Sequence, residues 1–234
     1  MDWTPEVDSV VATLSRTGWV VVNGGRLVDD PTLVAGLRQL SSHLLRDLDK
    51  FELSVVSPTV YSDEAYLANT DLGMSLHTDN VYLGTPCELV LMCLANQPES
   101  GGHSLLIDSH EVVQVLTDEL LQALARPVWQ WSRADQPSMV PCEVIKRNGE
   151  IRWWRRGLVG LDSVMVKVAD QFDRMLHEAD GVTTLTLESG DILVVDNRRI
   201  LHGRTPFVGA ERRLIRVRAW GTPEWSRPAL SHMP

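Results

Sequence analysis

His77 and Asp79 stand two residues apart, and a second histidine, His202, follows an apolar run far along the chain. Residues two apart on a strand, or where it ends, face the same side. His77 and Asp79 can therefore direct an imidazole nitrogen and a carboxylate oxygen at one point. With His202 they would form a metal site of two nitrogen ligands and one oxygen ligand. Such a site leaves coordination positions open for a substrate and for O₂.

An arginine-rich segment at 212–218 could supply the counter-charge for an acidic ligand. The planar guanidinium fork of arginine binds a carboxylate through two parallel hydrogen bonds. Taken alone, such a run more often forms the solvated edge of a sheet, and a lone His-x-Asp pair seldom marks a metal site. A strand here would place Arg212, Leu214, Arg216 and Arg218 on one face, and Arg213, Ile215 and Val217 on the other.

In combination, these segments resemble the Fe(II)/2-oxoglutarate dioxygenase superfamily, in the group that contains taurine dioxygenase, γ-butyrobetaine hydroxylase and clavaminate synthase-like enzymes. The resemblance extends from about Ser75 to Trp220, and its Asp-Asn-x-x-x-x-His-Gly-Arg stretch is highly specific. The anchors are His77-Thr78-Asp79, then Gly101-Gly102-His103-Ser104 followed by Leu105-Leu106-Ile107-Asp108, then the stretch 190–204 that ends in His202-Gly203-Arg204, and finally 212–216.

The resemblance implies a role for individual residues. His77, Asp79 and His202 would be the ligands of Fe(II). Ser104 lies where the family has a hydroxyl that helps to hold 2-oxoglutarate. Arg212 matches the arginine that pairs with the distal carboxylate of this co-substrate.

Two further assignments concern the arginines and the carboxylate ligand. Arg216 matches a position that in some relatives lies near the co-substrate or an acid group of the substrate. Arg213 is the alternative to Arg212, because the loop after His202 varies in length in the family, and the strand alternation favours Arg212. Related halogenases replace the carboxylate ligand with a small residue, so Asp79 disfavours halogenation.

The reaction that the resemblance implies is hydroxylation of an unactivated C–H bond, or desaturation or ring closure, with Fe(II), 2-oxoglutarate and O₂. If Arg216 faces the pocket, it favours a substrate that bears an acid. We therefore expect a small molecule, either a free amino acid or an amino-acid-derived metabolite of specialised metabolism.

Other functions stay open at this stage. One is a catabolic dioxygenase that acts on a sulfonate or a betaine. A non-catalytic jelly-roll protein that only binds a ligand should have lost a metal ligand, and none is lost. A cupin-like isomerase would not need Arg212 and Ser104 to hold a dicarboxylate.

The elements that would position these residues are short. Asn148-Gly149 marks a hairpin between two of the strands. Helices are expected from Thr4-Pro5 to Gly18, over 30–48, over 108–124 with a break near Thr117, and over 162–178. Strands are expected at 19–23, 53–57, 75–77, 87–95, 104–107, 128–132, 139–146, 151–154, 182–187, 192–196 and 212–220.

Many short strands with Gly and Pro between them predict a mostly β fold with helical cladding, built on a double-stranded β-helix (jelly-roll) core. One domain, 1–234, is expected, with N-terminal helices at about 4–48 packing on a core at about 51–222. The polar segment Asp63 to Leu72 is either a mobile lid or an ordinary exposed loop. Asn197 is expected either to support the loop before His202 and orient that ring, or to have a plain role in a turn.

The remaining histidines and the tryptophans are given structural roles. His103, His110 and His177 are expected at the surface or at helix ends. Sheet packing is the expectation for Trp129, Trp131, Trp153 and Trp154.

Composition is that of an ordinary globular protein, with 44% hydrophobic and 23% charged residues. The net charge of −9 disfavours nucleic acid as a partner. No apolar run approaches the length of a membrane span, and the N-terminus does not read as a secretory signal. A cytoplasmic location is expected, and a homodimer only from base rates.

The three cysteines are too few and too scattered for a disulfide framework or a zinc site.

Overall fold

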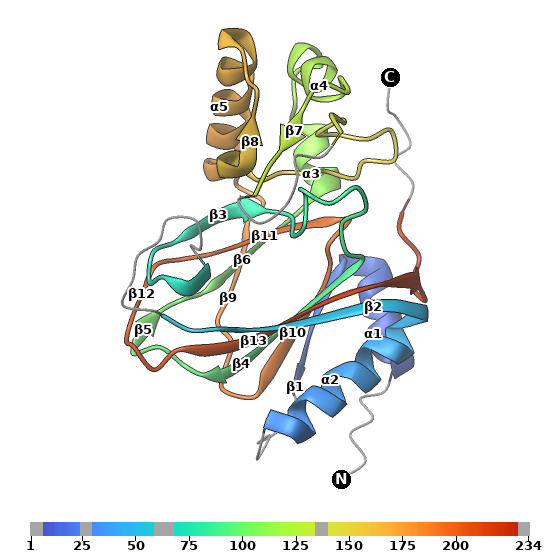
Figure 1. Cartoon of the computed structure of the whole chain (residues 1–234), viewed down its shortest axis with the longest axis vertical. Helices are drawn as coiled ribbons and strands as arrows, with labels where there is room; N and C mark the ends of the chain where they lie inside the picture. The colour runs from blue at the N-terminus through green and yellow to red at the C-terminus, as the bar shows by residue number, and fades with distance from the viewer. Residues whose placement is uncertain (1–6, 24–29, 59–67, 134–139, 229–234) are drawn as a thin grey trace.

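Two antiparallel sheets face each other in the computed structural model, and helices cover their outer faces (Figure 1). The structure describes residues 7–23, 30–58, 68–133 and 140–228. The two facing sheets with helices outside them confirm the predicted mostly β jelly roll with helical cladding. The division into one domain with the predicted boundaries stays a prediction.

The larger sheet has five strands. Their order across the sheet is β1 (Trp19–Asn23), β10 (Asp191–Asp196), β4 (Leu89–Asn96), β13 (Arg213–Pro223) and β2 (Leu45–Val56). The smaller sheet has four strands, in the order β3 (Met74–His77), β11 (Ile200–Arg204), β6 (Ser104–Asp108) and β9 (Thr183–Leu185). Two short ribbons pair β12 (Phe207–Val208) with β5 (Ser100–Gly101), and β7 (Gln130–Trp131) with β8 (Leu158–Val159).

The other named elements are five α-helices and one 3₁₀ turn. They are α1 (Val7–Thr17), α2 (Asp30–Leu44), α3 (Ser109–Gln114), α4 (Asp118–Leu124), the 3₁₀ turn η2 (Arg155–Gly157) and α5 (Ser163–His177). The break predicted near Thr117 is confirmed, because the Thr117 side chain accepts from Leu120 N and starts α4. Asp162 caps α5 in the same way.

Three hydrophobic clusters hold the layers together. Between the sheets, side chains of β4, β10 and β13 meet those of β6 and β11, among them Val90, Leu193, Leu214, Leu106 and Ile200. On the outer side of the five-stranded sheet, α1 and α2 pack on the alternate residues of the same strands. Both faces of β4 and β10 are thus buried, which explains why these two strands read as continuous apolar runs.

The third cluster lies on the outer side of the four-stranded sheet, beneath α3, α4 and α5. Trp129, Trp131 and Trp153 are at most 1% exposed there. Trp154 is partly buried against the same cluster, so the sheet packing predicted for all four tryptophans is confirmed. Cys87 and Cys93 are also fully buried.

The structure differs from the predicted elements in several places. The helix expected to reach residue 48 ends at Leu44, and Leu48 lies in β2, because Leu45 to Val56 pair with nearly the whole length of β13. This long-range pairing overrides the local helical pattern. The hairpin at Asn148-Gly149 turns as expected, but its arms make only isolated bridges such as Ile145↔Ile151. Residues 200–204 form a strand that the sequence did not predict.

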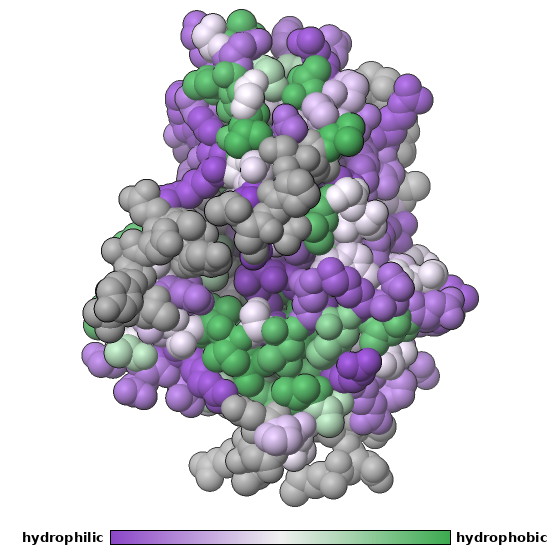
Figure 2. Space-filling view, in the orientation of Figure 1, coloured by the Kyte–Doolittle hydropathy of each residue, from purple (hydrophilic) through white to green (hydrophobic). Residues whose placement is uncertain are grey.

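Other expectations lie wholly or partly outside the described residues. These are the helix start at Thr4 and Pro5 and most of the candidate lid from Asp63 to Leu72. Among the residues that the structure describes, no helix is long and apolar enough to cross a membrane. Figure 2 shows an apolar area in the region where Figure 1 draws β2 and α2, and Leu53 and Val55 of β2 are exposed.

Replacing Leu193 with Ala should lower the free energy of unfolding by about 2–5 kcal/mol, because it opens a cavity between the sheets at a fully buried position. Urea denaturation measures the change. Val208→Ala, at a position that is 60% exposed, is the control and should cost less than about 0.5 kcal/mol. Equal losses in the two variants would contradict the two-sheet core.

Candidate metal centre

The pairing of β3 with β11 brings the two histidines together. His202 lies directly opposite His77 in the register, and the centroids of the two rings are 4.6 Å apart. Asp79 follows the end of β3, and its Oδ1 is 3.6 Å from His77 Nε2. One ligand atom from each of the three side chains lies within 4.8 Å of the others, and all three residues are buried. The structure therefore brings together the three residues that the sequence singled out.

Each residue of the His77-Thr78-Asp79 motif is fixed by hydrogen bonds. His77 Nδ1 lies 2.9 Å from the carbonyl oxygen of Ser75, which leaves Nε2 on the side of Asp79. Thr78 is held at both its backbone and its side chain: its N–H donates to Trp153 O, and its hydroxyl accepts from Trp153 N. Partners of this kind fix the orientation of ligands before a metal binds.

Asn197 holds Asp79 in place through the backbone. The Asn197 Oδ1 accepts from Asp79 N at 2.8 Å, and its Nδ2 donates to Asp79 O and to Cys87 O. The expectation that Asn197 orients the ring of His202 is wrong, because its amide is used by these partners and the buried His202 Nδ1 has no hydrogen-bond partner.

Gly203, next to His202, allows the two strands to approach. A Cβ at this position would lie 2.7 Å from the carbonyl oxygen of Met74, closer than side-chain carbons come to backbone atoms. The glycine of the His-Gly-Arg motif is therefore needed for the β3–β11 contact that places His202 opposite His77.

Arginines from the opposite sheet control the charge of Asp79. Burial opposes ionisation of this carboxyl, but Arg216 and Arg218 outweigh it and hold the pKa of Asp79 well below its usual value. Arg218 Nε donates to Asp79 Oδ2 at 2.7 Å, and Arg216 Nη1 is 3.5 Å from the same oxygen. Asp79 is therefore a carboxylate at neutral pH.

The pKa of His202 is lowered to about 3, first by burial and then by the neighbouring His77. A neutral imidazole and an ionised carboxylate are the protonation states that bind a metal. Two buried imidazoles and one carboxylate, with half of an octahedral coordination sphere left open, fit Fe(II). By its donor set and burial, the site suits this ion.

Arg212, predicted to bind the co-substrate, is a buried cation near the segment that contains Ser104. It is 5% exposed, its Nε has no hydrogen-bond partner, and burial lowers its pKa to about 10. A Cβ on Gly102 would lie 3.4 Å from Arg212 Nε, so the guanidinium passes close to this backbone. Among the described residues no carboxylate forms an ion pair with Arg212. A buried guanidinium in this state is suited to an anionic ligand.

Ser104 lies on the face of the smaller sheet that carries His202. It is opposite Arg204 in the β6–β11 register, two residues along β11 from His202. Directly opposed residues of an antiparallel pair share a face. Ser104 therefore faces the space between the sheets, on the same side as the candidate metal ligands.

Arg216 also faces this space, as the predicted alternation requires. Leu214, two residues before it, packs between the sheets, whereas Ile215 and Val217 pack beneath α1 and α2. Arg216 lies opposite Ser54 of β2. The Arg216 Nε and the Ser54 hydroxyl are both buried without hydrogen-bond partners.

Sequence analysis missed three contributions. It gave Arg218 no function, although strand alternation placed it on the same face as Arg216. It gave Ser54 no role, because nothing local links β2 to β13. Arg204 was treated only as part of a motif, yet its guanidinium donates to the carbonyl oxygens of Ala68, Thr70 and Leu72. The described end of the candidate lid is thus tied to β11.

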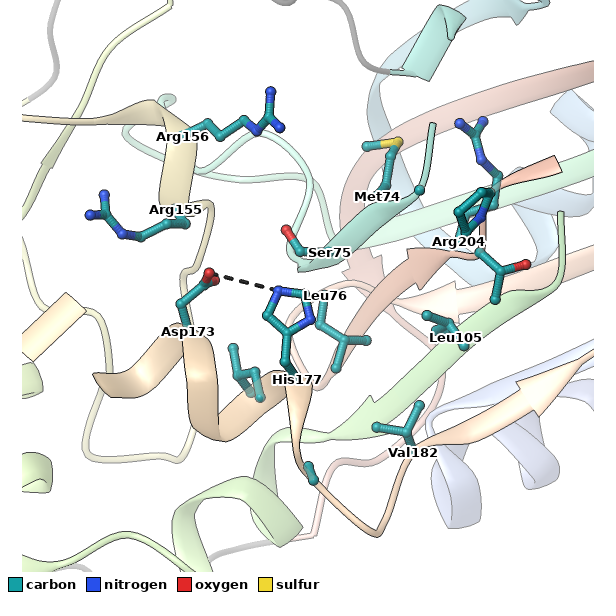
Figure 3. Close-up of a pocket in the computed structure, with 15 residues that line it drawn as sticks. Met74, Ser75, Leu76, Leu105, Arg155, Arg156, Asp173, His177, Val182 and Arg204 are labelled. Carbon is teal, nitrogen blue, oxygen red and sulfur yellow. Dashed lines mark ion pairs between the residues drawn. The ribbon is translucent and has the colours of Figure 1, made fainter. Parts of the chain in front are cut away.

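A separate pocket of about 590 Å³ lies on the outer side of the smaller sheet, between β3 and α5 (Figure 3). Its lining includes Ser75, Arg155 and Arg156, and it does not include the three candidate metal ligands. His177 pairs with Asp173 at its edge, 3.8 Å apart, in keeping with the structural role expected for this histidine. The pocket and the metal centre are on opposite faces of the sheet.

The family to which the chain belongs is the "Taurine catabolism dioxygenase TauD, TfdA family", whose model matches residues 3–139 and 158–218. Among curated proteins, the chain is 25% identical over 172 residues to the trimethyllysine dioxygenase of Meyerozyma guilliermondii, covering 64% of this chain and 42% of that protein. It is 24% identical over 217 residues to the dioxygenase str8 of Strobilurus tenacellus, covering 86% and 51%. The chain thus spans about half the length of these curated relatives.

Solved structures share the fold at low sequence identity. Asparagine oxygenase, in complex with Fe(II), 2S,3S-3-hydroxyasparagine and succinate, matches with a TM-score of 0.76 at 18% identity, covering 92% of this chain and 79% of that chain. The non-haem iron oxygenase OrfP, in complex with Fe and α-ketoglutaric acid, matches with a TM-score of 0.71 at 17% identity and the same coverage. These likenesses extend the jelly-roll assignment over nearly the whole chain.

In the metal-free protein, we expect the free energy of unfolding to fall as the pH is lowered below about 6.5. There the unfolded chain binds a proton at His202 that the folded protein takes up only near its pKa of about 3. The slope from this residue is at most about 1.4 kcal/mol per pH unit. Urea unfolding at several pH values measures it, and His202→Gln should flatten this part of the profile. Superimposable pH profiles for the two proteins would contradict the assignment.

Proposed function

We propose that this protein is an Fe(II)- and 2-oxoglutarate-dependent dioxygenase in which His77, Asp79 and His202 are the metal ligands. The observation that carries the proposal is the buried convergence of these three side chains, with ligand atoms within 4.8 Å of one another. Membership of the TauD, TfdA family supports it. The iron would supply the oxidising chemistry with O₂, and the protein would supply orientation and a site screened from water.

Ser104 and Arg212 would hold the distal carboxylate of 2-oxoglutarate. Ser104 faces the space between the sheets from β6. The buried Arg212 would gain the carboxylate partner that its guanidinium lacks among the described residues. The co-substrate would then reach from these two residues to two of the open positions on the metal.

An amino acid, or an acid derived from one, is the substrate class that we propose. Arg216 and Ser54 present unmatched donor groups to the space next to Asp79, and they would bind a carboxylate of the substrate. Asparagine oxygenase and OrfP were solved with hydroxylated asparagine and arginine, and a curated relative is a trimethyllysine dioxygenase. Hydroxylation in specialised metabolism is the reaction proposed.

A second candidate is a catabolic dioxygenase that acts on a sulfonate or betaine. The family description names taurine catabolism, and a sulfonate would bind Arg216 much as a carboxylate does. A screen of amino acids, betaines and sulfonates for substrate-stimulated release of succinate distinguishes the two candidates. A non-catalytic binding protein would release no succinate with any of them.

Replacing His77 or Asp79 with Ala should abolish 2-oxoglutarate turnover, because each variant loses one of three metal ligands. Succinate release in the presence of Fe(II) measures this, and circular dichroism checks that each variant is folded. His177→Ala is the control, since His177 lies at the outer pocket and should leave turnover unchanged. Full turnover by His77→Ala would refute the ligand assignment.

Arg212→Ala should raise the KM for 2-oxoglutarate far more than Arg213→Ala does. A lost charge-assisted pair to a carboxylate costs about 2–5 kcal/mol when it is buried, equivalent to roughly thirtyfold or more in KM. Steady-state kinetics with varied 2-oxoglutarate compares the variants. If Arg213→Ala has the larger effect, the co-substrate arginine is Arg213.

A further inference from the structure

The two carboxylate oxygens of Asp79 face different partners. Oδ1 points toward the histidines and lies 3.6 Å from His77 Nε2. Oδ2 accepts from Arg218 Nε at 2.7 Å. The carboxylate is therefore already divided, without any metal, into one oxygen on the ligand side and one on the arginine side.

This division matters because a carboxylate can bind a metal through one oxygen or through both. Three protein ligand atoms leave half of an octahedral sphere open. The two chelating atoms of 2-oxoglutarate would occupy two of these positions, and O₂ needs the last. If Asp79 bound through both oxygens, it would occupy that last position.

We propose that Arg218 is a positioning residue that holds Asp79 as a one-oxygen ligand and so keeps a coordination position open for O₂. The inference rests on the proposed function, since it takes His77, Asp79 and His202 as the ligands of Fe(II). It adds a residue from the opposite sheet to the set that shapes the coordination sphere.

The anchoring of Arg218 suits it to this task. It lies in β13, which is paired on both sides, opposite Glu52 of β2 and Val90 of β4. Its side chain is 13% exposed and crosses the space between the sheets to reach Asp79. A guanidinium fixed in this way donates along one direction, so it can select one oxygen.

Arg216 contributes charge but less direction. Its closest approach to Asp79 Oδ2 is 3.5 Å, through Nη1, and its Nε has no hydrogen-bond partner. It is thus placed to bind another ligand, whereas the Nε of Arg218 is committed to Asp79.

The test compares Arg218→Lys with Arg199→Lys. Arg199 is a matched control: it is buried, and its Nε donates to Asp108 Oδ2 at 2.8 Å, away from the metal ligands. Lysine keeps the positive charge in both variants but cannot reproduce the directed Nε–H bond. Arg218→Gln is a second variant, which removes the charge as well.

The measurements are made without O₂. The first is the affinity for Fe(II), measured by competition with a chromophoric chelator. The second is the affinity for nitric oxide of the protein loaded with Fe(II) and 2-oxoglutarate. Nitric oxide probes the position that O₂ would take, and electron paramagnetic resonance detects its binding. Arg218→Lys should bind Fe(II) roughly 10–100-fold more weakly, as loss of a partner of a metal ligand does, and should bind nitric oxide more weakly as well. Arg199→Lys should match the parent in both.

Three outcomes would overturn the proposal. Parent-like affinities for Fe(II) and nitric oxide in Arg218→Lys would show that the arginine does not position Asp79. Equal losses in Arg199→Lys would show a general effect of removing a buried ion pair. If the parent itself binds no Fe(II), the proposed function fails, and the role of Arg218 fails with it. The first two outcomes leave the proposed function standing. Should Arg218→Gln not fold, Arg218→Lys alone decides.

Discussion

The antiparallel pairing of β3 with β11 is the constraint on which the candidate site depends. It places His77 opposite His202, although more than a hundred residues separate them in the chain. A shift of one residue in this register would turn one histidine to the outer face of the sheet. Gly203 allows the strands to approach, and the backbone contacts of Thr78 and Asp79 fix where the chain leaves β3. The geometry of the candidate metal centre thus depends first on how these two strands pair.

The larger sheet supplies the positive charges that lie beside Asp79. Arg216 and Arg218 extend from β13 toward Asp79, the carboxylate of the candidate metal centre. Burying these cations is costly unless anions accompany them. Asp79 satisfies Arg218, whereas Arg212 and Arg216 keep unmatched donor atoms. This imbalance favours the binding of anions next to Asp79, which is the basis of the acidic co-substrate and the acidic substrate proposed above.

Much of this arrangement could be predicted from the sequence, because the features involved depend on the spacing of residues that are close together in the chain. The spacing of His77 and Asp79, the apolar strands, and the alternation that turns Arg216 inward all follow from the strand period. Leu48 was wrongly placed in a helix, because its strand is stabilised by distant β13. The bond between Arg218 and Asp79 could not be predicted, since it depends on how far apart the two sheets lie. Asn197 was expected to orient His202 and instead holds Asp79, because a short amide side chain has several partners within reach of one loop.

The central place of β13 bears on when the proposed metal site can form during synthesis. This strand fills the gap between β4 and β2, so the five-stranded sheet stays in two parts until residues up to Pro223 have left the ribosome. His202 and Arg218 emerge long after Asp79, and sheets with such distant pairings form slowly. Because the proposed site draws on His202 of β11 and on arginines of β13, it can be complete only after both strands have been translated.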